Sequence, residues 1–483
     1  MTTITKVLVA NRGEIALRII RACKELGITS VAMFSEVDID GIWVRKADEC
    51  YPILGNPIEA YLDYKRIVSL ALKAGCNAVH PGYGFLSENA EFAAACAEAG
   101  IIFIGPKPEH IALFGDKTAS KAAMKAIGVP VVEGTDAPVS DIETAKRISR
   151  DIGFPVIIKA AFGGGGRGMR IVRLESDFEE LYHSATSEAL KYFGKGDVFI
   201  EKYVQNPRHI EVQVMADKHG NVVHLGERDC SIQRRHQKVI EIAPSPSLGN
   251  AVRQTLCQMS VRAMKELGYE SVGTVEFLVD ENDTIYFIEM NTRVQVEHPV
   301  TELISGVDII QEMIHIAEGQ PLSVEQERIH FRGYAVEFRI NAEDPARNFL
   351  PSAGKITHYA APGGPGVRID TSAYAGYEIP PYYDSMVGKL IVWSMDWKGV
   401  VKKARRALDE FHVEGIPSNI PLHREITRDD DFIEGVFNTG YLDKNLGRFN
   451  LEARKHLEEE DAKVAAIARI ISSIKENNIA FRH

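Results

Sequence analysis

Two glutamates in the second half of the chain have the spacing of a metal site. The β-rich runs 274–279 and 284–290 flank Asn282-Asp283, which predicts a hairpin with a two-residue turn. Counting outward from that turn gives three opposed pairs: Asp280 with Ile285, Leu278 with Phe287, and Glu276 with Glu289. Opposed side chains lie about 5 Å apart, so two carboxylates there repel unless a cation separates them. With Asn291 on the same face, the hairpin predicts an oxygen-lined site for Mg²⁺ or Mn²⁺; solvated acids on a surface hairpin are the alternative.

The same alternation continues beyond the hairpin. If the chain stays extended, three polar residues follow on the metal face: Arg293, Gln295 and Glu297. Upstream, the segment 228–238 is dense in hydrogen-bond donors. An extended strand there would put three basic side chains on one face: Arg234, His236 and Lys238. That pattern fits an anion site beside the acidic hairpin, and it fits a solvated basic strand equally well.

A glycine-rich stretch predicts a nucleotide lid. Five glycines between 163 and 168 separate the short strand Val156–Ala160 from Ile171-Val172. Such a run is unsuited to a helix or strand interior, but its bare N–H groups can wrap phosphates. It lacks the Gly-Lys-Ser/Thr of a Walker A loop, and Lys159 just upstream favours a phosphate site over a flexible linker.

Two other segments are candidates for nucleotide contacts. Lys117 begins a predicted helix, 117–127, where a lone lysine is more often solvated. The predicted strand 197–203 ends in Glu201-Lys202-Tyr203-Val204, and its backbone could pair with an adenine edge.

The first elements of the chain are predicted to form part of the scaffold that positions these residues. A strand at 6–10, a helix at 15–26 and a strand at 28–34 predict a right-handed parallel unit. The turn Asn11-Arg12-Gly13-Glu14 lacks GxGxxG, so we interpret it as scaffold and not as a dinucleotide site. The loop 80–88 follows a strand end, where open α/β sheets bind ligands, although a tight turn alone would explain its glycines.

A new composition begins at 331. The run Tyr334–Asn341 alternates, with Glu337, Arg339 and Asn341 on one face, and a helix is expected at 397–411. This suggests a third, α+β domain. The tail 452–475 is predicted to be a helix that packs on the body or on a partner through an apolar stripe: Val464, Ile467, Ile471 and Ile474.

Composition narrows the class of protein. The 483 residues carry a net charge of −11 and no long basic run, which argues against nucleic acid or a membrane surface as partner. No apolar run is long enough to span a bilayer. Six scattered cysteines without a CxxC pair, and an N-terminus without a signal-peptide pattern, favour a cytoplasmic location.

Five segments together resemble biotin carboxylase, of the ATP-grasp superfamily, over about residues 4–446. They are Val-Leu-Val-Ala-Asn-Arg-Gly-Glu-Ile-Ala at 7–16, His-Pro-Gly-Tyr-Gly-Phe-Leu-Ser-Glu at 80–88, the glycine loop, Arg-Asp-Cys-Ser-Ile-Gln-Arg-Arg-His-Gln-Lys at 228–238, and Glu-Met-Asn-Thr-Arg-Val-Gln-Val-Glu-His at 289–298. The resemblance implies a Rossmann-like N-terminal domain (1–114), an ATP-grasp domain (115–330) with a mobile lid near 132–204, a C-terminal domain (331–446) and a helical tail (447–483). It implies that ATP and bicarbonate give carboxyphosphate, whose CO₂ passes to N1 of biotin on a carrier protein.

The resemblance also implies roles for individual residues. The ATP contacts would be Lys117, Lys159, Gly163, Gly164, Gly165, Gly166, Met169, Glu201, Lys202, Tyr203, Val204, His209, Gln233, His236, Glu276, Leu278 and Glu289. Two Mg²⁺ or Mn²⁺ ions would be held by Glu276, Glu289 and Asn291. The bicarbonate residues would be Lys238, Arg293, Gln295, Val296 and Glu297, and the biotin residues Tyr83, Arg339 and Asp384. The catalytic groups would be Arg293, Glu297, Lys238 and Arg339.

The chain shows no biotinyl carrier pattern. The nearest string, Ala123-Met124-Lys125-Ala126, lies in the helix predicted at 117–127. We therefore expect the chain to be one subunit of a split system, which works with a separate biotinylated carrier and carboxyltransferase. We also expect two copies of this chain to form a homodimer. The helical tail resembles that of the biotin carboxylase component of two-subunit pyruvate carboxylases. The alternatives are the corresponding component of acetyl-CoA or another acyl-CoA or 2-oxoacid carboxylase, another ATP-grasp carboxylate-amine ligase, or an inactive nucleotide-binding regulator.

Overall fold

The computed structural model describes residues 2–135, 137–160, 169–193, 196–449, 451 and 463–469. In its N-terminal part, five parallel strands form a sheet in the order β3-β2-β1-β4-β5. The strands are β1 (Lys6–Val9), β2 (Thr29–Phe34), β3 (Glu49–Pro52), β4 (Ala78–His80) and β5 (Ile102–Phe103). The helices are α1 (Gly13–Glu25), α2 (Ile42–Lys46), α3 (Pro57–Ala60), α4 (Tyr64–Lys73), α5 (Ala90–Glu98) and α6 (Pro108–Gly115). The predicted parallel strand–helix–strand unit at the start of the chain is confirmed.

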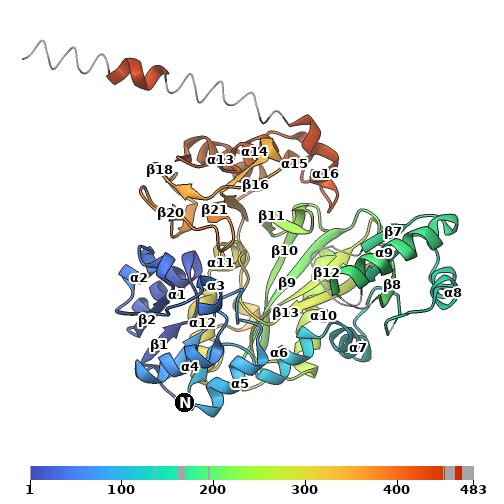
Figure 1. Ribbon diagram of the computed structural model, residues 1–483, viewed down its shortest axis with the longest axis horizontal. Helices are drawn as coiled ribbons and strands as arrows, with labels where there is room; N and C mark the ends of the chain where they lie inside the picture. Colours follow the sequence, from blue (N-terminus) through green and yellow to red (C-terminus); the bar gives the residue numbers. More distant parts are fainter. Residues whose placement is uncertain are drawn as a thin grey trace, which may run out of the picture.

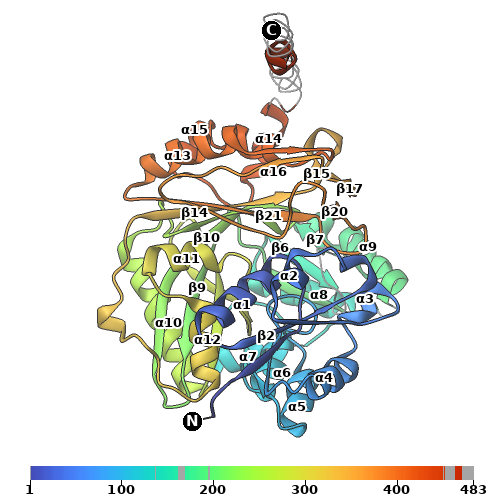
Figure 2. The ribbon, with the colours of Figure 1, turned by 90° about the vertical axis from the view of Figure 1, so that its left-hand side faces the viewer.

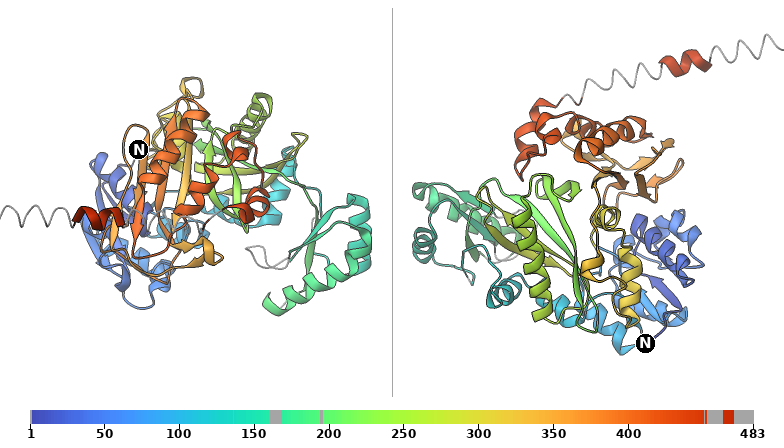
Figure 3. Two further views of the ribbon diagram at one scale, coloured as in Figure 1. Left: turned by 90° about the horizontal axis from the view of Figure 1, so that it is seen from above. Right: turned by 180° about the vertical axis from the view of Figure 1, so that it is seen from behind.

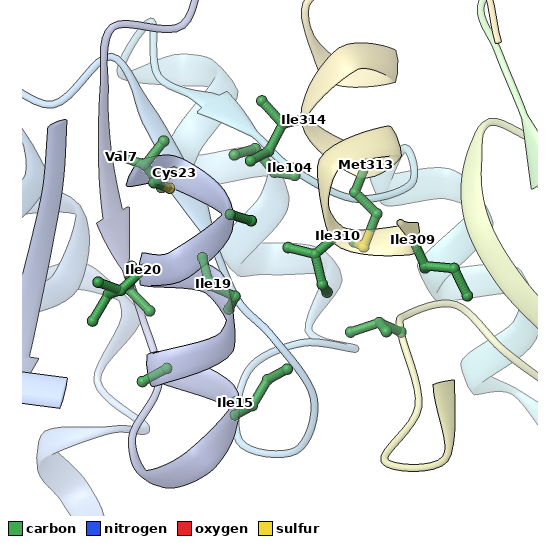
Figure 4. Close-up of a cluster of buried hydrophobic side chains, with 14 of the residues drawn as sticks. Val7, Ile15, Ile19, Ile20, Cys23, Ile104, Ile309, Ile310, Met313 and Ile314 are labelled. Atoms are coloured by element: carbon green, nitrogen blue, oxygen red, sulfur yellow. The ribbon is translucent and has the colours of Figure 1, made fainter. Parts of the chain in front are cut away.

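A shared apolar core ties α1 to a helix from much later in the chain, α12 (Ile309–Ala317). The α1 side chains Ile15 and Ile19 lie against Ile310 and Met313 in one buried cluster (Figure 4). Full burial of such an aliphatic side chain contributes roughly 1.5–3 kcal/mol. The N-terminal sheet is therefore held firmly against the centre of the molecule.

The centre of the molecule is one eight-stranded antiparallel sheet, ordered β13-β12-β9-β10-β11-β14-β21-β19. Its strands are β9 (Arg208–Ala216), β10 (Val222–Arg234), β11 (Gln237–Ala243), β12 (Ser271–Val279), β13 (Ile285–Asn291), β14 (Tyr334–Asn341), β19 (Val367–Thr371) and β21 (Met386–Ser394). The sheet passes without a break from β11 to β14, so the change of composition at 331 is not a break in the sheet. Figure 2 shows β14 and β21 crossing above β9 and β10.

Helices and short strands complete the body. The helices are α7 (Lys117–Ala126), α10 (Asn250–Glu266), α11 (His298–Ser305), α13 (Trp397–Glu410), α14 (Ile420–Ile426), α15 (Asp430–Ile433) and α16 (Tyr441–Asn445). The short strands are β15 (Glu343–Asp344), β16 (Leu350–Pro351), β17 (Gly354–Lys355), β18 (His358–Ala360), β20 (Glu378–Ile379) and β22 (His412–Glu414). The predicted helices at 117–127 and 397–411 are confirmed as α7 and α13. Met124 is buried within α7, so that tetrapeptide belongs to a packed helix.

A small three-stranded sheet, β7-β6-β8, stands apart from the body (Figures 1 and 3). It consists of β6 (Val156–Ala160), β7 (Met169–Val172) and β8 (Val198–Lys202), with α8 (Ile142–Ile152) and α9 (Phe178–Phe193) packed on it. The two strands predicted to flank the glycine stretch pair with each other as expected. Gly163, Gly164, Gly165 and Gly166 themselves lie outside the described residues.

The predicted register of the hairpin 274–290, which we call the metal hairpin, is correct for Glu276 and Glu289 and wrong near the turn. Glu276 lies opposite Glu289, as predicted. The opposition of Leu278 with Phe287 and of Asp280 with Ile285 is wrong, because Leu278 pairs with Tyr286 and a five-residue loop, 280–284, replaces the two-residue turn. A bulge at Ile288 then shifts the register by one residue. The bulge lets Phe287 face the core while Glu289 faces the site.

The predicted extension of 228–238 is also wrong. β10 and β11 form a hairpin whose turn is Arg235-His236, with φ of 49° and 64°. His236 is exposed at that turn, and Arg234 instead lies over the ring of Phe349. Lys238 pairs with Gln233 across the hairpin and turns into the molecule.

In the tail, residues 463–469 are helical and exposed (Figure 1). Val464 and Ile467 are 66% and 56% exposed, so these two members of the predicted stripe do not pack on the body. Ile471 and Ile474 lie outside the described residues. Among the residues described, no helix is both long and apolar enough to cross a membrane.

Candidate active site

A row of charged side chains crosses four neighbouring strands of the large sheet. Each residue of the row lies opposite the next one on the neighbouring strand. In order, they are Glu289 on β13, Glu276 on β12, Glu211 on β9 and Arg228 on β10. Glu211 and Arg228 are fully buried. Neither was singled out from the sequence, although the alternation of His209, Glu211 and Gln213 in an apolar strand was a readable signal.

Lys238 lies at the centre of this row. Its Nζ is 2.6 Å from Glu211 Oε2, 2.7 Å from Glu297 Oε1 and 3.1 Å from Glu276 Oε1. Burial acts to lower the pKa of Lys238, but the three carboxylates outweigh it and hold that pKa well above its usual range. A fixed ammonium ion therefore stands among three anions, where it can neutralise charge on a bound substrate.

Arg228 locks the carboxylates behind Lys238. Its guanidinium donates to Glu211 Oε1 and to the Gln295 side-chain oxygen. Its other contacts are Gln213 Oε1 at 2.8 Å, Thr301 Oγ1 at 2.9 Å and Thr274 Oγ1 at 3.2 Å. A planar guanidinium satisfied in all directions holds its neighbours in fixed orientations, so Arg228 is a positioning residue.

The three predicted metal ligands lie together. Asn291 Nδ2 donates to Glu276 Oε1 at 2.7 Å, and Glu276 Oε2 lies 2.8 Å from His209 Nε2. Burial and the charge of Glu276 raise the pKa of Glu289. The buried carboxylate of Glu276 and the half-buried one of Glu289, beside a carboxamide, match the hard-oxygen donors that Mg²⁺ and Mn²⁺ prefer.

Arg293 joins the hairpin to the loop 80–88. It donates to Glu88 Oε2 at 2.9 Å and to Asn291 Oδ1 at 2.7 Å. The backbone N–H of Thr292 donates to the other oxygen of Glu88 at 3.1 Å. The loop therefore lies at the site, as its place after a strand end suggested, and Glu88 is a contact that the sequence did not reveal.

Glu297 connects the two halves of the site. One oxygen meets Lys238, and the other accepts from Arg339 at 3.0 Å. Burial opposes ionisation of Glu297, but Lys238, Arg339 and Arg228 outweigh it and place its pKa well below the usual range. Glu297 is thus an ionised carboxylate between two cations, the state that a general base requires.

Two further acids lie behind Arg339. Glu241 accepts from Arg339, and burial raises the pKa of Glu241 to about 7 against the opposing charge of that arginine. Glu337 faces Glu241 across strands β11 and β14. Neither oxygen of Glu337 has a hydrogen-bond partner, and burial raises its pKa well above the usual range.

Of the remaining predicted substrate residues, Gln295 is buried, whereas Tyr83 and Asp384 lie at the rim of the site. Gln295 donates to Glu276 Oε1 at 2.8 Å, and the carbonyl of Val296 accepts from Lys389 at 2.8 Å. The Tyr83 hydroxyl donates to Glu14. Asp384 is exposed in the loop before β21, and its carboxylate accepts from the Met386 N–H at 3.1 Å.

The predicted nucleotide residues fall into two groups. On the large sheet, Leu278 pairs with His209, whose Nδ1 lies 3.0 Å from Gln233 Nε2. On the small sheet, Lys159 pairs with Met169 in register and forms an ion pair with Glu201. Lys117 is exposed at the start of α7.

The strand end that was predicted to meet adenine is already hydrogen-bonded in part. The N–H groups of Lys202 and Tyr203 donate to the carbonyls of Glu133 and Pro155, at 2.8 and 3.0 Å. Lys202 Nζ donates to the carbonyl of Gly153 at 2.8 Å. Val204 follows directly at the junction with β9. The segment 201–204 thus ends the last strand of the small sheet and begins the connection to β9 of the large one.

Three protein families match the chain in sequence. The biotin carboxylase N-terminal domain matches residues 3–111, the carbamoyl-phosphate synthase L chain ATP-binding domain matches 116–325, and the biotin carboxylase C-terminal domain matches 337–444.

Curated relatives are similar over nearly the whole chain. The 2-oxoglutarate carboxylase small subunit of Hydrogenobacter thermophilus is 53% identical, over 97% of this chain and 98% of its own length. A pyruvate carboxylase component of Methanothermobacter thermautotrophicus is 51% identical, over 95% and 94%. A biotin carboxylase of Pseudomonas aeruginosa is 52% identical, over 92% and 98%.

Solved structures agree with the sequence relatives. The biotin carboxylase domain dimer of the Hydrogenobacter thermophilus 2-oxoglutarate carboxylase, in complex with MgADP, ADP and bicarbonate, has a TM-score of 0.88 and 53% identity. It covers 93% of this chain and 99% of its own. The biotin carboxylase subunit of a pyruvate carboxylase has a TM-score of 0.82 and 52% identity, over 93% and 99%.

Proposed function

Because this chain belongs to the biotin carboxylase family, we propose that it carboxylates biotin on a separate carrier protein with ATP and bicarbonate, through carboxyphosphate. The chain is an ATP-dependent carboxylase of the ligase class. One observation supports the mechanism above all: one carboxylate oxygen of Glu297 contacts Lys238 and the other contacts Arg339. A single ionised base thus adjoins both the metal side and the third-domain side of the site.

We propose that ATP lies between the small and large sheets. Lys117, Lys159 and His209 would contact its phosphates or ribose, and 201–204 its adenine. Two Mg²⁺ or Mn²⁺ ions, held by Glu276, Glu289 and Asn291, would neutralise phosphate charge. The neighbours reported with MgADP and bicarbonate support this assignment. Glu289→Gln should then raise the Mg²⁺ concentration needed for turnover, and an unchanged Mg²⁺ titration would exclude Glu289 as a ligand.

In the first step, bicarbonate would lie between Arg293, Lys238 and the 295–296 segment. A guanidinium fork suits a planar anion. Glu297 takes the bicarbonate proton, and the freed oxygen attacks the γ-phosphorus. The bond from that phosphorus to the bridging oxygen of ADP breaks, giving carboxyphosphate and ADP.

In the second step, carboxyphosphate breaks into CO₂ and phosphate. The released phosphate takes the proton of biotin N1, and N1 bonds to the carbon of CO₂. Negative charge develops on the biotin ureido oxygen as N1 is deprotonated. Arg339 is a fixed cation that can stabilise this charge, with Tyr83 and Asp384 nearby on the rim.

The final acceptor is a finer question, and we propose pyruvate, with this chain as the biotin carboxylase component of a two-subunit enzyme. The match over 94% of a pyruvate carboxylase component supports this, and the equally complete match to a 2-oxoglutarate carboxylase small subunit makes that acid the main alternative. Mass spectrometry of the biotinylated protein that co-purifies with this chain, followed by acceptor assays of the complex, distinguishes them. A dimeric relative supports a homodimer.

Two arginine variants test the proposed function. Phosphate release and labelled carbon fixed on free biotin are measured together. Arg293→Ala should lose bicarbonate-dependent ATP cleavage and biotin carboxylation together, by about 10²–10³-fold. Arg339→Ala should lose carboxylation, while slow biotin-independent ATP cleavage survives.

Three outcomes contradict the proposal in different ways. Loss of biotin-independent ATP cleavage in folded, ATP-binding Arg339→Ala refutes the division between the arginines. ATP cleavage that needs an amine acceptor and ignores biotin indicates another ATP-grasp ligase. Nucleotide binding without any cleavage in the unaltered chain indicates a regulator.

A further inference from the structure

The turn Asn11-Arg12-Gly13-Glu14, which follows β1 and includes the first two residues of α1, has three polar side chains that reach three different segments of the site. The sequence suggested only a scaffold here, since the turn has no dinucleotide-binding pattern. Its side chains are nearly or fully withdrawn from water, with Asn11 2% and Glu14 8% exposed. Buried polar side chains normally have hydrogen-bond partners within the protein, so the partners of these residues show what the turn holds in place.

Asn11 fixes the loop 80–88. Its amide nitrogen donates to the backbone carbonyl of Pro81 at 2.7 Å and to that of Tyr83 at 2.8 Å. Between those two carbonyls lies Gly82, with φ of +65°, where an added Cβ would approach Asn11 Nδ2 to 2.9 Å. The backbone on both sides of Gly82 is therefore held at one distance from the turn.

Arg12 fixes the other loop of the rim. Its guanidinium donates to Asp38 at 2.8 and 3.2 Å and lies over the Tyr383 ring, 3.8 Å from the centroid. The Tyr383 hydroxyl is 2.8 Å from Ser35 Oγ, and its ring meets that of Phe85 edge-on. Tyr383 immediately precedes Asp384, so Arg12 holds that residue's loop against the N-terminal sheet.

Glu14 connects the loop 80–88 to the segment after the metal hairpin. It accepts from the Tyr83 hydroxyl and lies 2.9 Å from Lys389 Nζ. Lys389, fully buried, donates to the Val296 carbonyl at 2.8 Å. Two hydrogen bonds thus link the turn to the residue beside Glu297.

We propose that the Asn11–Glu14 turn positions the biotin pocket, by holding Tyr83 and Asp384 on two separate loops at a fixed distance from Val296. The inference rests on the proposed function, which places biotin beside Tyr83, Asp384 and Arg339. Arg12, Asn11 and Glu14 touch no substrate in this assignment. They act through the residues they hold, as partners one step removed from a site commonly do.

Arg12 gives the sharpest test, because it lies over Tyr383, beside Asp384, and its other contacts, Asp38, Trp43 and Tyr377, are not among the residues assigned to ATP or bicarbonate. In Arg12→Met, the KM for free biotin should rise about 10-fold or more, since small misplacements of binding groups cost this much. ATP cleavage without biotin should stay within about twofold of the unaltered chain. Arg12→Lys keeps the charge beside Asp38 and should recover part of the loss. Lys6→Met, which breaks the 2.7 Å pair with Glu49 in the same sheet, is the matched control and should change neither value.

A purely structural role for Arg12 predicts a different result. It would lower the thermal midpoint and reduce both activities by the same factor, with the KM for biotin unchanged, because a smaller folded fraction does not alter KM. That result in Arg12→Met overturns the proposal. If Arg12→Met does not fold, Tyr383→Leu decides in its place, since it removes the ring that Arg12 lies over; an unchanged KM there overturns the proposal as well.

A double variant separates this inference from the proposed function. If Arg12 acts through the Asp384 loop, Arg12→Met and Asp384→Ala together should raise the KM by less than the product of their separate effects. Multiplicative effects overturn the positioning role. An unaltered chain that fixes no carbon on biotin refutes the proposed function itself, before any variant is compared.

Discussion

At the scale of single residues, the charged groups around Arg339 shift one another's pKa values. Glu241 and Glu337 lie opposite each other, both buried, and share the field of Arg339. The low dielectric of the interior disfavours two adjacent anions, so protons are retained there that an exposed glutamate would lose. The acids behind Arg339 therefore carry less negative charge at neutral pH than their number suggests.

This arrangement predicts a pH dependence of stability. The folded pKa of Glu241 is about 7 and its ordinary value is 4.5, so the folded chain binds more protons between those pH values. The free energy of unfolding should therefore fall as pH rises from about 4.5 to 7, by at most about 3 kcal/mol from this group. Glu241→Gln should remove that part of the slope in urea unfolding at pH 5 and 7.5.

The control for this measurement is Glu325→Gln. Glu325 is exposed beside Arg328, with its side chain 70% accessible, so its removal should leave the slope as it is. If Glu241→Gln and the unaltered chain lose stability in parallel over this range, Glu241 is ionised throughout and the prediction fails.

At the scale of elements, the small sheet is the part expected to respond to nucleotide. Lys159 is paired with Glu201, and a bound phosphate would compete for that ammonium ion. We expect the backbone amides of β6 and β8 to exchange with deuterium more slowly when MgATP is added, because the lid would then close over the nucleotide. Amides of β1 and β2 serve as the internal control. Equal exchange in β6 and β8 with and without MgATP would rule out closure.

The hairpins show how far alternation alone can predict a site. The pairing of Glu276 with Glu289 was predictable because the pattern of apolar residues fixed the faces beyond the turn. The bulge at Ile288 was not, since one inserted residue leaves no compositional signature. The turn Arg235-His236 was missed because neither residue is typical of positive φ.

Contacts between distant segments were beyond the reach of the sequence pattern. The parallel unit at the N-terminus and the pairing of the metal hairpin are local, and periodicity predicted them. Arg228 contacts Gln295, 67 positions away in the sequence, and Glu88 contacts Arg293, 205 positions away. Only the fold brings these residues together. Their roles followed from the structure.

At the scale of the whole molecule, one continuous sheet carries both the residues proposed to bind ATP and those proposed to bind biotin. Strand β11 pairs with β14, and the two contribute Lys238 and Arg339 to one site. A chain ending at 330 would expose the β11 edge and remove the apolar partners of Ile240 and Ile242. Exposed apolar edges promote aggregation.

We therefore expect the fragment 1–330 to give little soluble protein, judged by the soluble fraction after expression and by size-exclusion chromatography. A chain ending at 451 keeps every strand of the large sheet and should remain as soluble as the full chain. A soluble, monomeric 1–330 fragment that binds ATP normally would show that the two parts fold independently.

Lys238 has one further consequence. An ammonium group has three hydrogens to donate, and here three carboxylates already receive them: Glu211, Glu276 and Glu297. An anion that arrives beside Lys238 must replace a contact that the protein makes with itself. Its affinity is the small difference between two similar sets of bonds, so such an anion is held weakly and leaves quickly. Under the proposed function, substrate binding at this ammonium is ligand exchange, and release of Glu297 would free the carboxylate that is proposed to take the proton.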